Sequence, residues 1–248
     1  MSGHSKWSTI KHKKSKEDAK RGKLFSKLTK AIMIAAREAG SDPKQNIALA
    51  QAIQKAKDFN MPKINIERAI KKGSGESDSY ILEKIVYEGY GPEGVAVIVE
   101  VMTDNRKRTA AEMRNIFSRH NGNLGSKGCV GWMFNRKGVI SIKDGSSIDE
   151  DEILLVAIDA GADDVNIEKD HYEIYTEPTM LMKIKNFLIE KGISPDSSEI
   201  VLLPRNFRIL DESKTLKALK LIDAIYEQED VQEVYTNFEI PDGLMEKL

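Results

Sequence analysis

The stretch Gly138–Leu203 decides the fold class, and it reads GVISIKDGSSIDEDEILLVAIDAGADDVNIEKDHYEIYTEPTMLMKIKNFLIEKGISPDSSEIVLL. Runs rich in β-branched residues predict strands, at Gly138–Lys143, Asp164–Glu168, Tyr172–Thr176 and Ser198–Leu203. Apolar residues at helical spacing predict helices, at Asp149–Ala160, with Ile153, Leu154, Ala157 and Ile158 buried, and at Pro178–Glu190. The resulting order, β-α-β-β-α-β, is ferredoxin-like, and we expect its two helices to cover one face of an antiparallel sheet.

Before this stretch the sequence predicts a small helical bundle. A capping box that begins at Ser15 opens a first helix, and Gly40 ends it in the left-handed conformation that suits glycine. Pro43 takes the first position of a second helix. Pro62 opens a short third helix that Gly73 stops. Three amphipathic helices with short connections are expected to pack as a bundle.

Beyond a linker at Gly73–Ser79, the apolar period changes from 3.6 to 2. The expected elements are strands at Ile85–Glu88 and Val95–Val101, a helix at Lys107–His120, and a strand in which Val130, Trp132 and Phe134 alternate. After the ferredoxin-like stretch come a helix, Ser213–Tyr226, and a strand, Val231–Ile240. These last two are too few to form a domain, so we expect them to join the region before Gly138.

The predicted fold class is therefore α+β and multidomain. Residues 1–75 form a basic arm and an N-terminal three-helix bundle, and residues 80–135 plus 206–248 form a discontinuous αβ domain. Residues 136–205 form a ferredoxin-like βαββαβ domain inserted in it.

Charge is distributed unevenly along the 248 residues. The whole chain has a net charge of −1, and its hydrophobic content of 40% excludes a wholly disordered protein. Residues 1–75 hold 18 basic residues against six acidic ones, a net charge of +12, whereas the rest hold 20 and 33, a net charge of −13. Such asymmetry indicates a nucleic-acid, membrane or acidic-partner surface in the basic part. The alternative is that the two parts attract each other within the molecule.

Three short motifs resemble ligand-binding motifs, but their sequence context favours a structural role. Gly89-x-Gly91-x-x-Gly94 matches the dinucleotide fingerprint, but a strand follows where the fingerprint needs a helix, which favours a hairpin turn. The stretch Gly122–Gly128 either cradles an anion with its backbone N–H groups or connects a helix to a strand, and the connection is favoured. Asp149–Glu152 either chelates a cation or complements a helix dipole, and the dipole is favoured.

The remaining chemistry-bearing residues also predict no enzyme. The four histidines are scattered, without the spacing of a metal site. Cys129 has no partner in the sequence for nucleophilic catalysis and is expected to be a small buried hydrophobe. We therefore predict no catalytic residues, no metal and no cofactor.

The sequence indicates a cytoplasmic location. A lone cysteine suits a reducing compartment, and the N-terminus lacks the apolar run of a signal peptide. Apolar runs such as Val95–Val99 are far too short to span a bilayer, so no membrane partner is expected.

The basic arm and the first turns of the helix after it carry the strongest functional signal. The candidate nucleic-acid contacts are Lys6, Trp7, Lys11, His12, Lys13, Lys14, Lys16, Lys20, Arg21, Lys23 and Lys27. Lysines on phosphates release counterions, which gives salt-dependent affinity, but as point charges they carry little sequence specificity. Trp7 either stacks on a base or packs the arm onto a core.

A second candidate is the polar loop Thr103–Thr109. Its bases Arg106, Lys107 and Arg108 either meet phosphate or an acidic partner, or stay solvated while Asp104 or Asn105 caps the following helix.

Several long strings, taken in order along the whole chain, resemble the YebC/PmpR family. They are GHSKW (Gly3–Trp7), IKHKK (Ile10–Lys14), DAKRGKLFSKL (Asp18–Leu28), NMPKINIERAIKKG (Asn60–Gly73), YEGYGPEGVAVIVE (Tyr87–Glu100), TDNRKRT (Thr103–Thr109) and NGNLG (Asn121–Gly125). The resemblance implies the three domains described above. It also implies a probable transcriptional regulator that binds DNA, or a translation factor on or near the ribosome, as in the mitochondrial activator of cytochrome oxidase subunit one synthesis. It implies no catalytic motif.

Three functions therefore stay open. The first is a DNA-binding regulator whose acidic domains face protein partners. The second is a ribosome-associated translation factor whose basic surface binds structured RNA. The third is a protein-interaction scaffold that uses its charge only within the molecule. The scarcity of arginine in the basic part and the lack of an obvious recognition helix favour low sequence specificity, which tilts the balance slightly toward RNA or non-specific duplex binding.

Overall fold

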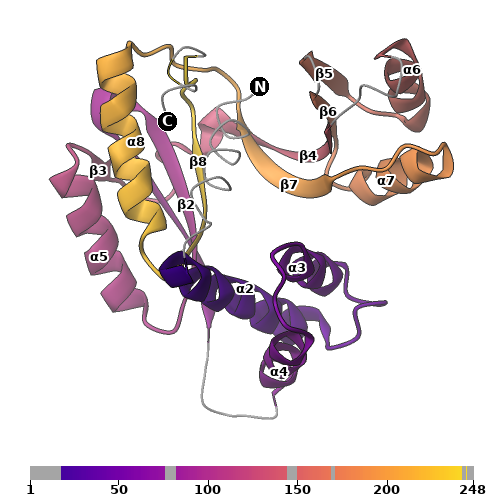
Figure 1. Cartoon of the computed structure of the whole chain (residues 1–248). Helices are drawn as coiled ribbons and strands as arrows, with labels where there is room; N and C mark the ends of the chain where they lie inside the picture. Colours follow the sequence, from indigo (N-terminus) through magenta and orange to yellow (C-terminus); the bar gives the residue numbers. More distant parts are fainter. Residues whose placement is uncertain (1–17, 76–81, 144–149, 169–170, 242–243, 245–248) are drawn as a thin grey trace. The chain divides into compact units, whose positions relative to one another are not determined.

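The computed structural model describes residues 18–75, 82–143, 150–168, 171–241 and 244 (Figure 1). These residues divide into two compact units, Trp132–Phe207 and the stretches on either side of it. Among the residues that the structure describes, none of the helices combines the length and the apolar character that a membrane span requires.

The unit Trp132–Phe207 contains a four-stranded antiparallel sheet and two helices. Its elements are β4 (Phe134–Lys143), α6 (Glu150–Ala160), β5 (Asp164–Glu168), β6 (His171–Thr176), α7 (Leu181–Glu190) and β7 (Ser197–Pro204). The strands lie in the order β5-β6-β4-β7. Ile140 on β4 lies opposite Ile174 on β6, and both pack against Ile153 of α6 and Leu188 of α7. The order of elements is thus the β-α-β-β-α-β expected from the periodicity.

The buried face of α6 is narrower than its sequence predicts. Ile153 and Ala157 are buried as expected, but Leu154 and Ile158 are exposed, and so is Leu155. The helix is apolar on most of its circumference, so periodicity alone does not distinguish the face that meets the sheet.

The strand predicted across Val130, Trp132 and Phe134 is wrong. Gly131–Met133 form a 3-10 turn, and Phe134 is the first residue of β4. The backbone turns here because the N–H groups of Val130 and Gly131 both donate to the side chain of Glu88, which an alternating strand does not allow.

The second unit contains an antiparallel sheet built from both flanking stretches of the chain. Its elements are β1 (Glu83–Tyr90), β2 (Ala96–Thr103), α5 (Arg106–Arg119), β3 (Asn123–Leu124), α8 (Glu212–Tyr226) and β8 (Val231–Thr236). The strand order is β3-β1-β2-β8. A hairpin with a 3-10 turn at Pro92–Gly94 joins β1 to β2, which confirms the turn expected at the Gly89-x-Gly91-x-x-Gly94 string.

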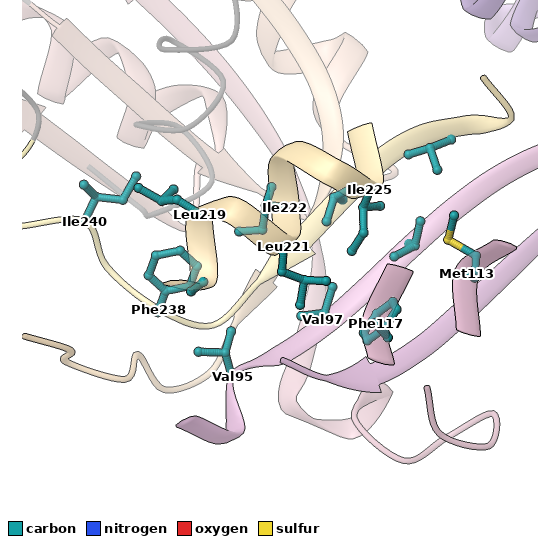
Figure 2. Close-up of a cluster of buried hydrophobic side chains, with 14 of the residues drawn as sticks. Val95, Val97, Met113, Phe117, Leu219, Leu221, Ile222, Ile225, Phe238 and Ile240 are labelled. Atoms are coloured by element: carbon teal, nitrogen blue, oxygen red, sulfur yellow. The ribbon is translucent and has the colours of Figure 1, made fainter. Parts of the chain in front are cut away.

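Helices α5 and α8 lie beside this sheet (Figure 1). Their apolar side chains form one core with those of its strands. Figure 2 shows Met113 and Phe117 of α5 and Ile222 and Ile225 of α8 in one apolar cluster with Val97 of β2. Strand β8 pairs with β2, with Val234 opposite Val99. The C-terminal helix and strand therefore share a core with the region before the ferredoxin-like stretch.

Three helices precede this sheet in the same unit: α2 (Asp18–Ala39), α3 (Ile47–Asp58) and α4 (Lys63–Gly73). Leu28 and Ile32 of α2 pack against Leu49 of α3 and Ile66 of α4. Gly40 follows α2 with φ 90°, the left-handed conformation expected there.

The second helix does not begin at Pro43. Residues 43–45 form a turn, and α3 begins at Ile47 with Asn46 as its cap. The Asn46 Oδ1 accepts from the Leu49 N–H at 3.0 Å, and its Nδ2 donates to the carbonyls of Ala35 and Gly40, each at 2.7 Å. A buried asparagine that satisfies the ends of two helices outweighs the preference of proline for a first helical position.

Gly73 lies at the close approach of α4 to α2. A Cβ placed there would come within 2.4 Å of the Met33 carbonyl oxygen, whereas a Cβ at Gly22 of α2 would meet nothing. We expect Gly73→Ala to lower the free energy of unfolding by about 1–3 kcal/mol through overpacking. Gly22→Ala, the matched control in a helix, is expected to raise it by about 0.5–1 kcal/mol. Chemical denaturation followed by circular dichroism measures both, and shifts of the same sign would contradict the account of Gly73.

Candidate nucleic-acid interface

Most of the predicted basic contacts lie outside the described residues. These are Lys6, Trp7, Lys11, His12, Lys13, Lys14 and Lys16. Lys20 and Arg21 fall in the first turn of α2. The described part of the surface therefore begins with Lys23.

Lys23 and Lys27 of α2 contact the C-terminal end of α8, at Glu227 and Tyr226. The Lys23 Nζ lies 3.2 Å from a carboxylate oxygen of Glu227, with both side chains largely exposed. The Lys27 Nζ donates to the Tyr226 carbonyl oxygen at 2.7 Å and lies 5.6 Å from the centre of the Tyr226 ring. Both ammonium groups therefore interact with the αβ part of the same unit.

Asp230, in the connection between α8 and β8, is the centre of a buried polar cluster. Its carboxylate accepts hydrogen bonds from the Lys30 Nζ at 2.6 Å, the Arg108 Nη2 at 3.0 Å and the Thr109 Oγ1 at 2.7 Å. Its side chain is only 2% exposed. Burial raises the pKa of Asp230, but the hydrogen bonds and the positive charge of Lys30 outweigh burial, so the pKa lies well below its ordinary value.

One more pair joins the helical part to β8. The Lys55 Nζ of α3 lies 2.7 Å from a carboxylate oxygen of Glu233. Together with the ion pairs of Lys23 and Lys30, this pair shows that part of the positive charge of residues 1–75 is neutralised within the unit. The intramolecular alternative therefore holds for these three lysines, whereas Lys27 contacts an uncharged carbonyl and an aromatic ring.

The polar loop before α5 follows the capping alternative. The Asn105 Oδ1 accepts from the Arg108 N–H at 3.1 Å and caps the helix. The Arg108 guanidinium bonds Asp104 as well as Asp230, and its hydrogen bond to Asp230 raises its pKa. Arg106 and Lys107, by contrast, are exposed. All three bases thus lie in the first turn of α5 and not in a loop, and the Arg108 side chain is held by Asp104 and Asp230.

A basic face that we did not single out in the sequence lies on α4. Arg68, Lys71 and Lys72 are exposed, and their spacing of three and four residues places them on one side of the helix. Lys71 and Lys72 lie in the last turn, where positive charge complements the helix dipole. The dipole therefore explains these two lysines, but it does not explain Arg68. The i, i+3, i+4 spacing of bases within a short amphipathic helix was the signal available in the sequence.

The stretch Gly122–Gly128 connects α5 to β3 and continues beyond it, as favoured from the sequence, and the backbone at its end, Gly128–Gly131, binds an anion that is a side chain of the same chain. The Glu88 carboxylate accepts from the N–H groups of Gly128 at 2.8 Å, Val130 at 3.0 Å and Gly131 at 2.7 Å. Burial raises the pKa of Glu88, but the three backbone donors and the charge of Lys127 together hold it below its ordinary value. This nest is already filled, so a phosphate has no place in it.

Cys129 lies in the same loop and is partly buried. Burial raises the pKa of its thiol, and the nearby Glu88 carboxylate raises it further, which disfavours the reactive thiolate. Glu150, Asp151 and Glu152 occupy the first turn of α6, where acids favour the helix dipole. Within the described ranges no three His, Cys, Asp or Glu side chains converge as metal ligands do.

Comparison with known proteins identifies the family. The family model described as the TACO1/YebC protein N-terminal domain matches residues 5–76, and the model of the TACO1/YebC second and third domain matches residues 82–238. A protein of Halothermothrix orenii named probable transcriptional regulatory protein is 54% identical, with 100% of this chain and 99% of that protein covered. A protein of Trichlorobacter lovleyi with the same name is 52% identical over the whole of both chains.

A solved structure agrees with these matches. The crystal structure of a conserved hypothetical protein from Aquifex aeolicus is 46% identical and superposes with a TM-score of 0.82, covering 91% of this chain and 93% of that one. Since both family models match in order and full-length relatives share half of its residues, the chain belongs to the TACO1/YebC family.

Proposed function

We propose that this protein is a non-enzymatic, nucleic-acid-binding regulator, and specifically a DNA-binding transcriptional regulator. The observation that carries the proposal is the exposed basic face of α4, formed by Arg68, Lys71 and Lys72. The names of the relatives, probable transcriptional regulatory protein, support the regulatory role. In this proposal the three domains are those predicted from the sequence, with residues 1–75 as the binding domain.

The proposed contact surface combines the arm, the first turn of α2 and the basic face of α4. Arm lysines at positions such as 11, 13 and 14 and the α4 bases contact phosphates, because point charges recognise the backbone of a nucleic acid more than its bases. Lys23 and Lys27 serve instead to hold α2 against the C-terminal end of α8, as their contacts indicate. Arg106 and Lys107 extend the same chemistry to the N-terminus of α5.

Binding of structured RNA on the ribosome is the second candidate function. The same lysine-rich surface supports it, because the phosphate backbone is common to both nucleic acids. The only arginines of residues 1–75 are Arg21, Arg37 and Arg68, which gives little support for base readout in the major groove.

The acidic part of the chain is proposed to contact protein partners. In support, α6 exposes Leu154, Leu155 and Ile158, with exposed fractions of 37%, 63% and 58%. Three large apolar side chains on one helix, after an acidic first turn, are typical of a surface that meets another protein. A partner with a basic and apolar surface suits this helix.

Charge reversal on α4 tests the proposal. For the variant with Arg68, Lys71 and Lys72 all changed to Glu, we expect the affinity for a promoter-length duplex to fall by at least about tenfold at low salt. The slope of log affinity against log salt is expected to become shallower by about 2.7, since each lost contact on duplex DNA contributes about 0.9. Fluorescence anisotropy across a salt series measures both quantities. The same experiment on the Lys11/Lys13/Lys14→Glu variant tests the arm.

A matched control is Lys183/Lys185/Lys191→Glu, which reverses three charges on and just after α7. If this control lowers affinity as much as the α4 variant does, binding depends on net charge and the α4 face is not a site. Binding to the duplex that resists competitor DNA supports the regulator. Co-sedimentation with ribosomes at moderate salt, without competitor-resistant duplex binding, supports the RNA alternative.

A further inference from the structure

The edge of the first sheet is incomplete beside β1. Strand β3 has two residues and pairs only with Gly89 and Tyr90 of β1. The neighbouring carbonyl of Glu88 accepts from the Gly125 N–H at 2.8 Å, after which the chain leaves the edge. Residues 83–87 of β1 therefore have β2 on one side and no paired strand, among the described residues, on the other.

The hydrogen-bond pattern of β1 shows which of its backbone groups face this open edge. The Gly91 N–H donates to the Val95 carbonyl oxygen, so alternate residues counted back from Gly91 exchange bonds with β2. The residues between them turn their N–H and C=O groups the other way. In the open stretch these are Lys84 and Val86, and both residues are exposed.

A groove of about 480 Å³ runs along this open stretch, and its volume falls in the range of ligand sites. Ile85 and Tyr87 face the side covered by α5 and α8, because they lie opposite Val101 and Val99 of the core. Lys84 and Val86 consequently face the other side. The groove thus includes both sides of the sheet edge.

Positive charge lines the groove on both sides. Arg106 and Arg114 come from α5. Burial raises the pKa of Tyr87, and the positive charges of these two arginines offset part of that rise. Lys84 of β1 and Lys127 of the loop after α5 also line it, and the Lys84 Nζ lies 3.6 Å from a carboxylate oxygen of Glu100 on β2, so Lys127 is the main cation on that face. The acids in the lining are Glu83 and Glu88, and Glu88 is occupied by its three backbone donors.

We propose that this open edge of β1 binds an extended acidic peptide segment of a partner protein as an added antiparallel or parallel strand. A peptide strand donates and accepts hydrogen bonds alternately, as the outward N–H and C=O groups of Lys84 and Val86 require. A nucleic-acid phosphate only accepts, so it would face the two carbonyl oxygens without a donor. The edge therefore favours a peptide over a nucleic acid.

The charges specify the chemistry of that peptide. Side chains of a strand alternate between the two faces of the sheet, and the groove has cations on both faces. The best ligand therefore carries acids on both faces, with β-branched apolar residues between them to contact Ile85, Tyr87 and Val86. The open stretch of five residues spans about 17 Å, which a peptide of six to eight residues covers. The groove shares Arg106 with the proposed nucleic-acid surface, and its other lining residues take no part in that surface.

The probe is a fluorescein-labelled eight-residue peptide with the repeat Glu-Glu-Val-Val, titrated with the full chain and followed by anisotropy. Methylation of alternate amide nitrogens leaves one edge of the peptide able to pair, so binding is expected to persist. Methylation of every amide nitrogen removes all donors without changing charge, so binding is expected to be lost. If the parent peptide does not bind, or if the fully methylated peptide binds equally well, strand addition is wrong.

Two pairs of variants locate the site. Arg114→Glu is expected to weaken peptide binding about tenfold, whereas Arg119→Glu, an equal charge change on the same helix outside the groove, is expected to leave it unchanged. Val86→Pro removes one outward N–H while leaving the β2 pairing, so it is expected to weaken binding about tenfold. If Val86→Pro does not fold, the methylation series on the unmodified chain decides. If Arg114→Glu and Arg119→Glu weaken binding equally, the groove is not the binding site. If an eight-nucleotide oligothymidylate displaces the peptide from the groove, the ligand class of this site is a nucleic acid and not a peptide.

Discussion

Changing Asp230 to Asn is expected to lower the free energy of unfolding of its unit by about 3 kcal/mol. The variant keeps the shape of the side chain but replaces an anion with a neutral group between Lys30 and Arg108, whose nitrogens lie 2.6 and 3.0 Å away. Hydrogen bonds to charged groups contribute about 1.5–3 kcal/mol each, and losing the charge of a buried partner is costly. For a unit of this size the expected drop in Tm is roughly 6–12 °C, measured by differential scanning calorimetry.

The matched control is Glu227→Gln, in the same connection between α8 and β8. Glu227 also pairs with a lysine of α2, but its side chain is 67% exposed, so its loss is expected to cost no more than about 1 kcal/mol. Equal losses in the two variants would contradict the role of burial at Asp230. The difference between them would measure how strongly the three-helix part depends on this one buried carboxylate.

Acid is expected to remove the Asp230 stabilisation in wild type. The pKa of Asp230 is lower in the folded chain than in the unfolded one. The stabilisation is therefore complete above the unfolded carboxylate pKa of about 4 and is lost as pH falls through the folded pKa. The Asp230→Asn variant is expected to lose less stability than wild type over this acid range.

Changing Glu88 to Gln is expected to cost about 2–3 kcal/mol. The Glu88 carboxylate accepts three backbone N–H groups, and an amide at its place offers one oxygen and presents an NH2 group to the remaining donors. The turn at Gly131–Met133 and the start of β4 are expected to loosen with it. Chemical denaturation gives the loss of stability, and hydrogen exchange at Val130 gives the local loosening.

Glu83→Gln is the control, since Glu83 lies on the same strand and is exposed. It is expected to change stability by less than about 0.5 kcal/mol. The folded pKa of Glu88 lies below its ordinary value. The difference in the free energy of unfolding between wild type and Glu88→Gln is therefore expected to be largest above about pH 5 and to shrink as the pH falls. A difference that stays constant down to about pH 3 would contradict the nest.

Local periodicity was sufficient for most of the fold. The strands and helices between Phe134 and Pro204 follow the predicted order, and α8 and β8 join the sheet built before them. Errors occurred where a side-chain hydrogen bond, either local or from a distant residue, determined the backbone conformation. Asn46 moved the start of α3 away from Pro43, and Glu88 turned the backbone at Gly131.

The candidate site was less predictable than the fold. Composition located the basic part of the chain, but it did not distinguish lysines that pair within the molecule from bases that remain exposed. Lys30 is bound to an aspartate 200 positions away, whereas Arg68 of α4 is exposed. Such pairings depend on which surfaces the fold brings together.

The sequence by itself determined the α+β class, the β-α-β-β-α-β order, the family and the separation of charge, because each depends on residue type and spacing along the chain. The tertiary structure alone decided that Asp230 neutralises Lys30, that Glu88 fills the anion nest and that, within the described part of the chain, β1 has an unpaired stretch at its edge. The physical reason is that a hydrogen bond or an ion pair requires contact within about 3–4 Å. Only the folded chain brings residues 40 to 200 positions apart to that distance.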